Sequence, residues 1–184
     1  MPRSPDLIRL LSDPPGRADR RSIGRSNAVA AFVLKHPQSR TFGTAQLVRA
    51  LWHSDPIVRM RAADALEKAS TSKPAIISRF KSELLGLLSE TPQQELRWHL
   101  ALMLPRLPLT LGERRRSVTH LRRYLDDRSS IVKTCALQAI FELSEQDSSL
   151  RPEALDLLRA AARSGTAAMR ARSRILLKRI KAES

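Results

Sequence analysis

The stretch Asp-Pro-Ile-Val-Arg-Met-Arg-Ala-Ala-Asp-Ala-Leu at residues 55–66 decides the fold class. Its opening Asp-Pro is a turn and helix-start signal, because aspartate caps free backbone N–H groups and proline fits the first helical turn. Val58, Ala62, Ala65 and Leu66 then follow the spacing that places side chains on one face of a helix. The stretch predicts an amphipathic helix whose buried face carries small and branched side chains.

The same pattern recurs downstream at intervals of 36 to 38 residues. In each copy a basic residue directly follows the first apolar residue. The copies are Leu96, Arg97, Leu100, Met103 and Leu104; Val132, Lys133, Ala136, Ala139 and Ile140; and Met169, Arg170, Ser173, Leu176 and Leu177. A weaker upstream copy comprises Gly24, Arg25, Ala28, Ala31 and Phe32. A fixed period of this length is typical of helical repeat proteins.

Second helical patterns lie between these copies, at residues 44–53, 74–88, 112–125 and 151–162. Turn-forming residues such as Ser54-Asp55-Pro56 and Thr91-Pro92 separate the patterns, and strand-like alternation is absent from the sequence. Each repeat is therefore predicted to be a helical hairpin. A hairpin of about 37 residues cannot bury its own apolar face, so neighbouring hairpins must stack.

The quoted stretch resembles the second-helix pattern of HEAT repeats, and the resemblance extends over about residues 20–180. It implies an all-α fold, a right-handed α-solenoid of about four to five HEAT-like hairpins. The expected repeats are residues 20–40, 42–70, 74–105, 112–145 and 151–182, in a single domain over residues 20–184. Residues 1–19 precede it as a segment with a short helix at residues 6–11. HEAT arrays are scaffolds, adaptors, nucleic-acid binders and, rarely, enzymes, so the resemblance implies an architecture and leaves the activity open.

The charge of the chain is strongly positive and unevenly distributed. The formal net charge is +15, with +5 in residues 1–41, +4 in residues 42–150 and +6 in residues 151–184. Such a charge suits nucleic acid or an acidic protein partner. The excess of 26 arginines over 7 lysines fits phosphate-binding guanidinium groups, and a GC-rich genome produces the same bias. No signal-peptide pattern and no apolar run of membrane-spanning length occurs, so a soluble cytoplasmic protein is expected.

Residue patterns for catalysis or metal binding are missing from the sequence. The four histidines lie in separate repeats, and Cys135 has no partner cysteine and is expected to be a small buried thiol. No Gly-rich phosphate loop and no nucleophile motif occurs. The expectation is therefore a protein that is not an enzyme and needs no cofactor or metal.

The basic residues of the repeated pattern form a predicted row, Arg25, Arg59, Arg97, Lys133 and Arg170. Three interpretations stay open at this point: pairing with turn aspartates such as Asp55, Asp126 and Asp127, a row facing a ligand, and simple exposure to solvent. In HEAT arrays, pairing of this position with a turn aspartate is common. Trp98 beside this row either packs between repeats or stacks on a partner.

Two further basic groups have alternative interpretations. Arg170, Arg174, Lys178 and Lys181 form one stripe on the last predicted helix, with Leu176, Leu177 and Ile180 expected to face inward. The stripe either binds phosphates or gives the terminal repeat a polar outer face. The second group is Arg114, Arg115, Arg116, His120, Arg122 and Arg123. It belongs to a first helix of a hairpin, so a solvated face is favoured there.

Two functional hypotheses follow. The first is a non-catalytic binding or scaffold module that holds an acidic protein or peptide. The alternative is a duplex-DNA binder, which extends to a glycosylase-type activity in some HEAT-like proteins. In residues 58–66 Asp64 is the only carboxylate, which gives that extension little support. The candidate partner-binding residues are Arg59, Arg61, Arg97, Trp98, Lys133, Arg170, Arg174 and Lys178.

Overall fold

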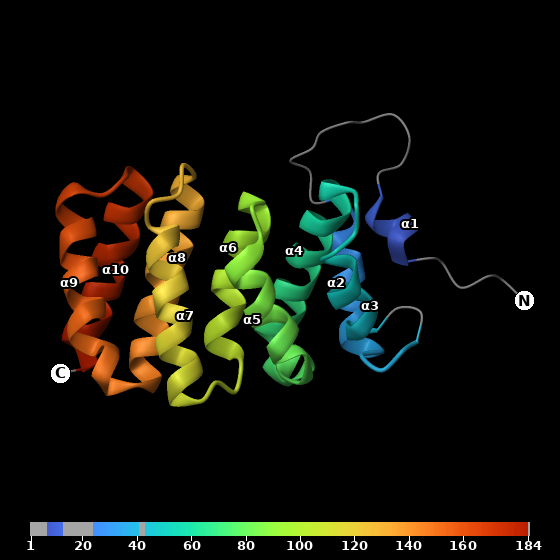
Figure 1. The fold of residues 1–184 in the computed structure, drawn as a ribbon, viewed down its shortest axis with the longest axis horizontal. Helices are drawn as coiled ribbons and strands as arrows, with labels where there is room; N and C mark the ends of the chain where they lie inside the picture. Colours follow the sequence, from blue (N-terminus) through green and yellow to red (C-terminus); the bar gives the residue numbers. More distant parts are fainter. Residues whose placement is uncertain (1–6, 13–23, 41–42, 184) are drawn as a thin grey trace, which may run out of the picture. The chain divides into compact units, whose positions relative to one another are not determined.

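The computed structural model of the protein describes residues 7–12, 24–40 and 43–183, with side chains up to residue 180 (Figure 1). Within these residues the structure has ten α-helices, three 3-10 segments and no strand. The predicted all-α class is thereby confirmed. The chain divides into two compact units, Met1–Leu84 and Leu85–Ser184, which are described one at a time. No helix in the described ranges has both the length and the apolar character needed to cross a bilayer.

In the first unit, the helix that carries the quoted stretch is the central element. This helix, α4 (Pro56–Ser72), contacts α1 (Leu7–Leu11), α2 (Ser26–Lys35), α3 (Thr44–Ala50) and the 3-10 segment η1 (Pro74–Phe80). Asp55 caps α4, because its carboxylate accepts a hydrogen bond of 2.8 Å from the backbone N–H of Ile57. Val58, Ala62, Ala65 and Leu66 are fully buried, as their spacing predicted. Small alanine side chains let the neighbouring helices approach α4 closely.

The rotation of α2 differs from the prediction. Ala28, Ala31 and Phe32 were expected in the core, but all three are exposed, Phe32 to 40%. Val29, Ala30 and Val33 are buried instead, together with Ser26. The Ser26 hydroxyl donates a hydrogen bond to the buried carboxylate of Asp64 on α4, so this side of α2 faces α4. The upstream copy of the repeat was therefore assigned in the wrong register.

In the second unit, α8 (Ser130–Gln146) is the central helix. It contacts α6 (Gln94–Met103), α7 (Leu111–Tyr124), α9 (Arg151–Ser164) and α10 (Ala167–Glu183). The remaining elements are η2 (Leu104–Arg106), η3 (Ser148–Leu150) and α5 (Lys81–Glu90), which crosses the boundary between the units. Because α8 touches α6 on one side and α10 on the other, these three helices form one layer, and Figure 1 shows α7 and α9 covering α8 and α10.

The predicted inner positions of α6, α8 and α10 form the core of this unit. The positions that are at most 9% exposed are Leu96, Leu100, Met103, Leu104, Val132, Ala136, Ala139, Ile140, Met169, Ser173 and Leu176. Leu177 and Ile180 are partly buried against the same core, as expected. A capping box between Thr110 and Glu113 starts α7, with each side chain bonded to the backbone of the other residue.

Candidate partner-binding surface

The basic row predicted from the repeat is used largely for internal hydrogen bonds. Nη1 of Arg59 donates to the carbonyl oxygens of His53 and Ser54 at 2.7 and 3.0 Å. Arg97 and Arg170 donate in the same way to Thr91 and Gly165, at 2.9 and 2.6 Å. In each case the guanidinium satisfies a carbonyl in the turn just before its own helix, where helical hydrogen bonding has ended.

Arg97 also makes one of the aspartate contacts that the sequence suggested. Its Nη1 atom lies 2.5 Å from Oδ2 of Asp127, whose side chain is only 6% exposed. Burial disfavours ionisation of Asp127, but the backbone N–H of Ser129 and the Arg97 guanidinium outweigh it and hold the pKa of this carboxyl below its ordinary value. The Arg97 guanidinium also lies over the Tyr124 ring, and burial raises the pKa of Tyr124 to about 12.

The other members of the row have different surroundings. Lys133 is half-buried, and its charge contributes to the lowered pKa of Asp127. Arg25 is exposed at the N-cap of α2, and the corrected register of α2 places it outside the row. Arg59, Arg97 and Arg170 thus have structural roles, which removes most of the expected ligand-facing row.

Arg61 does not contribute to a surface, so its assignment as a partner-binding residue was wrong. Its side chain is fully buried, and its Nη1 atom donates a hydrogen bond of 3.0 Å to the carbonyl oxygen of Leu11 at the end of α1. Its guanidinium also lies against Gly24, where an added Cβ would be 2.8 Å from Nε of Arg61. This hydrogen bond links the end of α1 to α4.

One row of exposed and half-buried residues runs across α6, α8 and α10, and we call it the outer stripe. It consists of Glu95, Trp98 and Leu102 on α6, Ile131, Thr134 and Gln138 on α8, and Ala168, Ala171 and Ile175 on α10. These residues occupy equivalent positions in the three helices, three and four residues apart. None of them is basic, and most are apolar or small.

Two isoleucines of the outer stripe are unusually open to solvent. The side chain of Ile131 is 52% exposed and that of Ile175 is 58% exposed. Trp98 is half-buried, and its ring lies 5.5 Å from that of the buried His99. Sequence analysis missed both isoleucines, although each lies on the helical face opposite the inner positions that it did identify.

Exposed cations in this unit lie beside the outer stripe or on other helices. On α10, Arg174 and Lys178 are exposed as predicted, whereas the side chain of Lys181 lies outside the described residues. Arg172 lies three residues before Ile175 and Lys178 lies three residues after it, which places both next to Ile175 on the helix surface. Arg179 pairs with Glu145 on α8 at 2.5 Å.

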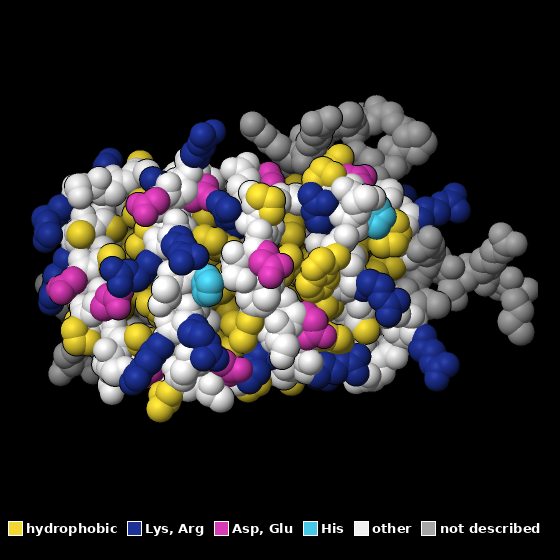
Figure 2. All heavy atoms as spheres, in the orientation of Figure 1, with side chains coloured by type: hydrophobic (Ala, Val, Ile, Leu, Met, Phe, Trp, Pro, Cys, Tyr) yellow, Lys and Arg dark blue, Asp and Glu magenta, His cyan; other side chains and the backbone are white. Residues whose placement is uncertain are grey.

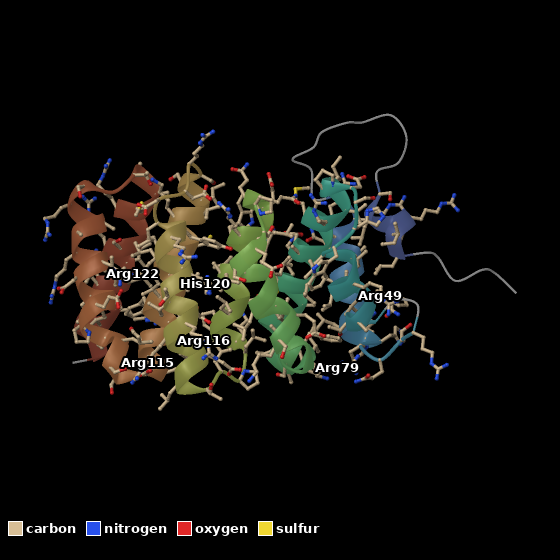
Figure 3. All side chains as sticks on the ribbon, viewed as in Figure 1. Arg49, Arg79, Arg115, Arg116, His120 and Arg122 are labelled. Carbon is tan, nitrogen blue, oxygen red and sulfur yellow. The ribbon has the colours of Figure 1, made fainter. Side chains whose placement is uncertain are left out.

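The arginines of α7 face solvent among carboxylates. Figure 3 shows Arg115, Arg116, His120 and Arg122 projecting from α7 toward the viewer. Figure 2 shows the same face as a mixture of dark blue and magenta side chains. A guanidinium nitrogen of Arg115 lies 3.8 Å from a carboxylate oxygen of Asp147, and one of Arg122 lies 3.2 Å from a carboxylate oxygen of Glu153. Pairing reduces the positive field of this face.

In the described ranges no group of three or more His, Cys, Asp or Glu residues is arranged to hold a metal ion. Cys135 is half-buried, so the expectation of a buried thiol was wrong. Comparison with known protein families and with curated proteins finds no match for this chain.

Proposed function

We propose that this protein is a non-catalytic binding module built from HEAT-like helical hairpins in a right-handed solenoid. In the second unit, the pairs α7/α8 and α9/α10 have the same inner positions, and α6, α8 and α10 contact one another in succession, which supports stacking of repeats. The recurring arginine that bonds the preceding turn in α4, α6 and α10 supports a common hairpin design.

The outer stripe is the proposed binding surface, and the exposure of Ile131 and Ile175 is the observation that carries this proposal. Both side chains are branched and more than half exposed, and their contact with water costs free energy. A partner that covers them recovers about 25 cal/mol for each Å² of apolar area buried. Burial of apolar side chains at the centre of a contact is typical of protein interfaces.

The partner that best fits this surface is an amphipathic helix of another protein, with carboxylates along one edge. Its apolar face would cover Ile131, Ile175 and the exposed part of Trp98. Its carboxylates would meet Arg172 and Lys178, which flank Ile175. In such a contact the apolar anchors give affinity and the surrounding charges set orientation.

Site-specific photo-crosslinking in cells of the source organism tests the proposal. A photoreactive amino acid replaces Ile131 in one variant and Ile175 in a second, and mass spectrometry identifies the crosslinked species. Leu111 supplies a matched control, because it is 56% exposed but lies at the start of α7. We expect both stripe variants to crosslink the same protein and the Leu111 variant not to. Crosslinking to nucleic acid, or no product specific to the stripe variants, would contradict the proposal.

Duplex DNA is the alternative ligand, supported by the net charge of +15 and by the arginines of α7. Titration of a random duplex over a range of salt concentrations distinguishes it, because neutralised phosphates release counterions and make affinity fall steeply with salt. Micromolar or tighter binding near physiological salt with such a slope favours DNA. A flat response or an absence of binding favours the protein partner.

A further inference from the structure

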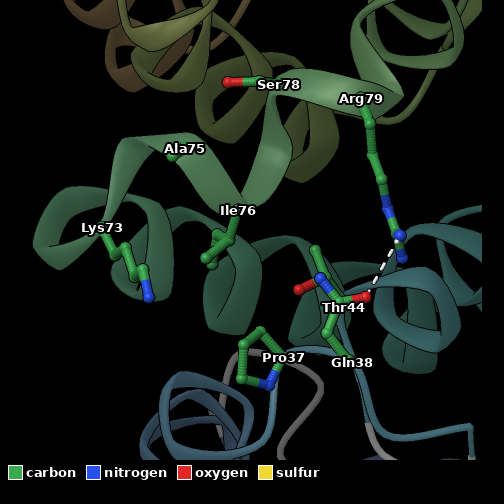
Figure 4. Close-up of a pocket in the computed structure, with 8 residues that line it drawn as sticks. All are labelled: Pro37, Gln38, Thr44, Lys73, Ala75, Ile76, Ser78 and Arg79. Atoms are coloured by element: carbon green, nitrogen blue, oxygen red, sulfur yellow. Dashed lines mark hydrogen bonds between the residues drawn. The ribbon is translucent and has the colours of Figure 1, made fainter.

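The first unit contains a pocket that the proposed binding surface does not use. It has a volume of about 310 Å³, within the range of small-ligand sites. Its lining residues come from the α2–α3 connection, the start of α3, and η1 with the residue before it. They are Pro37, Gln38, Thr44, Lys73, Ala75, Ile76, Ser78 and Arg79 (Figure 4).

Two cationic side chains give this pocket positive charge at two separate places. Lys73 and Arg79 are exposed cations, and no acidic residue lines the pocket. Figure 4 shows Lys73 on one side and Arg79 on the other, with the apolar side chains of Ile76 and Pro37 between them. Arg79 donates a hydrogen bond of 3.3 Å to Oε1 of Gln38, which leaves the amide nitrogen of Gln38 as a further donor on the same side.

A buried hydroxyl in the lining lacks a hydrogen-bond partner. Thr44 is only 2% exposed, and its Oγ1 makes no hydrogen bond among the residues described. In Figure 4 this side chain lies beside Gln38, below the guanidinium of Arg79. A buried polar atom without a partner is costly, and native structures avoid it unless water or a ligand supplies the bond.

We propose that this pocket binds a small organic dianion of the dicarboxylate class. One carboxylate meets Arg79, the Gln38 amide and the Thr44 hydroxyl, and the other meets Lys73. The methylene chain between them lies against Ile76 and Pro37, both of which offer apolar surface. A single small anion would leave one of the two cations unused, because they stand on opposite sides of the lining.

Calorimetric titration of the full chain with succinate, glutarate and adipate tests this assignment, with acetate and inorganic phosphate as single-anion probes. We expect saturable binding of at least one dicarboxylate, tighter than acetate or phosphate. Arg79→Gln and Lys73→Gln should each weaken it about tenfold or more, as expected for loss of a charged hydrogen bond. Arg49→Gln is the matched control, since Arg49 is an exposed arginine of the same unit that does not line the pocket, and it should have no effect.

The substitution Thr44→Val tests whether the Thr44 hydroxyl binds the ligand, independently of any effect on folding. Valine keeps the shape but removes the unpartnered oxygen, so the free protein should melt at the same or a higher temperature while the dicarboxylate binds more weakly. The proposal fails if no dicarboxylate binds saturably, if acetate or phosphate binds as tightly, if Thr44→Val leaves the affinity unchanged, or if Arg49→Gln weakens binding as much as Arg79→Gln.

Discussion

Arg97 on α6 reaches across 30 residues of sequence to Asp127, in the turn before α8, and the two charged groups approach to 2.5 Å. The same guanidinium bonds the carbonyl oxygen of Thr91 in the turn before its own helix. One side chain therefore ties together two successive turns of the second unit. The basic residue of the repeat is a structural element at this position.

Replacing Arg97 by alanine should destabilise the protein measurably. The variant removes the guanidinium that bonds the carboxylate of Asp127, which is 6% exposed, and we expect a loss of about 1–3 kcal/mol in the free energy of unfolding. Urea denaturation measures this value. Arg123→Ala is the control, because Arg123 is exposed on α7 and its loss should change stability by less than about 0.5 kcal/mol. Equal effects of the two substitutions would contradict the structural role.

The Asp127 carboxyl should contribute to acid sensitivity. Its folded pKa is lowered, so the stability it provides is fully present above the unfolded value of about 4 and is lost as the pH falls through the folded pKa. The difference in unfolding free energy between wild type and Asp127→Asn should therefore shrink below about pH 4. Unfolding curves recorded from neutral to strongly acidic pH measure this difference. A difference that is independent of pH would show that Asp127 does not titrate in this way.

The chain has a single tyrosine, so its ionisation at alkaline pH can be followed by absorbance without overlap from another tyrosine. Tyr124 is buried and its hydroxyl donates a hydrogen bond of 2.6 Å to the carbonyl oxygen of Leu88, while burial raises its pKa to about 12. Near-ultraviolet absorbance should show ionisation near pH 12 in the folded protein and near 10 in denaturant. Since the folded pKa is raised, stability from this group should be intact below about pH 10 and decline toward 12. Ionisation near 10 in the native protein would contradict the burial.

Replacing Gly24 and Gly86 by alanine should change the stability of the protein in opposite directions. Gly24 has φ of +52° and lies against Arg61, so Gly24→Ala introduces backbone strain and a clash, and should cost about 1–2 kcal/mol or more. Gly86 lies within α5 with open space around its Cβ position, so Gly86→Ala should stabilise by up to about 1 kcal/mol. Thermal denaturation compares them. A stable Gly24→Ala protein would mean that Arg61 does not hold this turn tightly.

The helical periodicity predicted most of the core but little of the surface. Val58, Leu96, Val132 and their partners one turn later are buried, as the helical spacing of these apolar residues predicted. In α2 the predicted inward face was wrong, and the side that is buried is the one on which Ser26 bonds Asp64 of α4. Tertiary contacts of this kind have no signal in a single sequence.

The burial of Arg61 could have been predicted from its spacing in the sequence. It lies three residues after Val58 and four before Ala65, which places it on the buried face of α4. The carbonyl contacts of Arg59, Arg97 and Arg170 depend on turn geometry, which spacing does not specify. The pocket around Thr44 combines segments more than 25 residues apart, so only the folded chain brings them together.

Binding of the protein identified by crosslinking, measured with the double variant Ile131→Lys/Ile175→Lys, is the most direct test of the outer stripe. Both side chains are more than half exposed, so the variant should keep the wild-type melting temperature while its affinity falls by about a hundredfold. Leu111→Lys should bind as tightly as wild type. Unchanged affinity in the double variant, or equal weakening by Leu111→Lys, would contradict a partner seated on α6, α8 and α10.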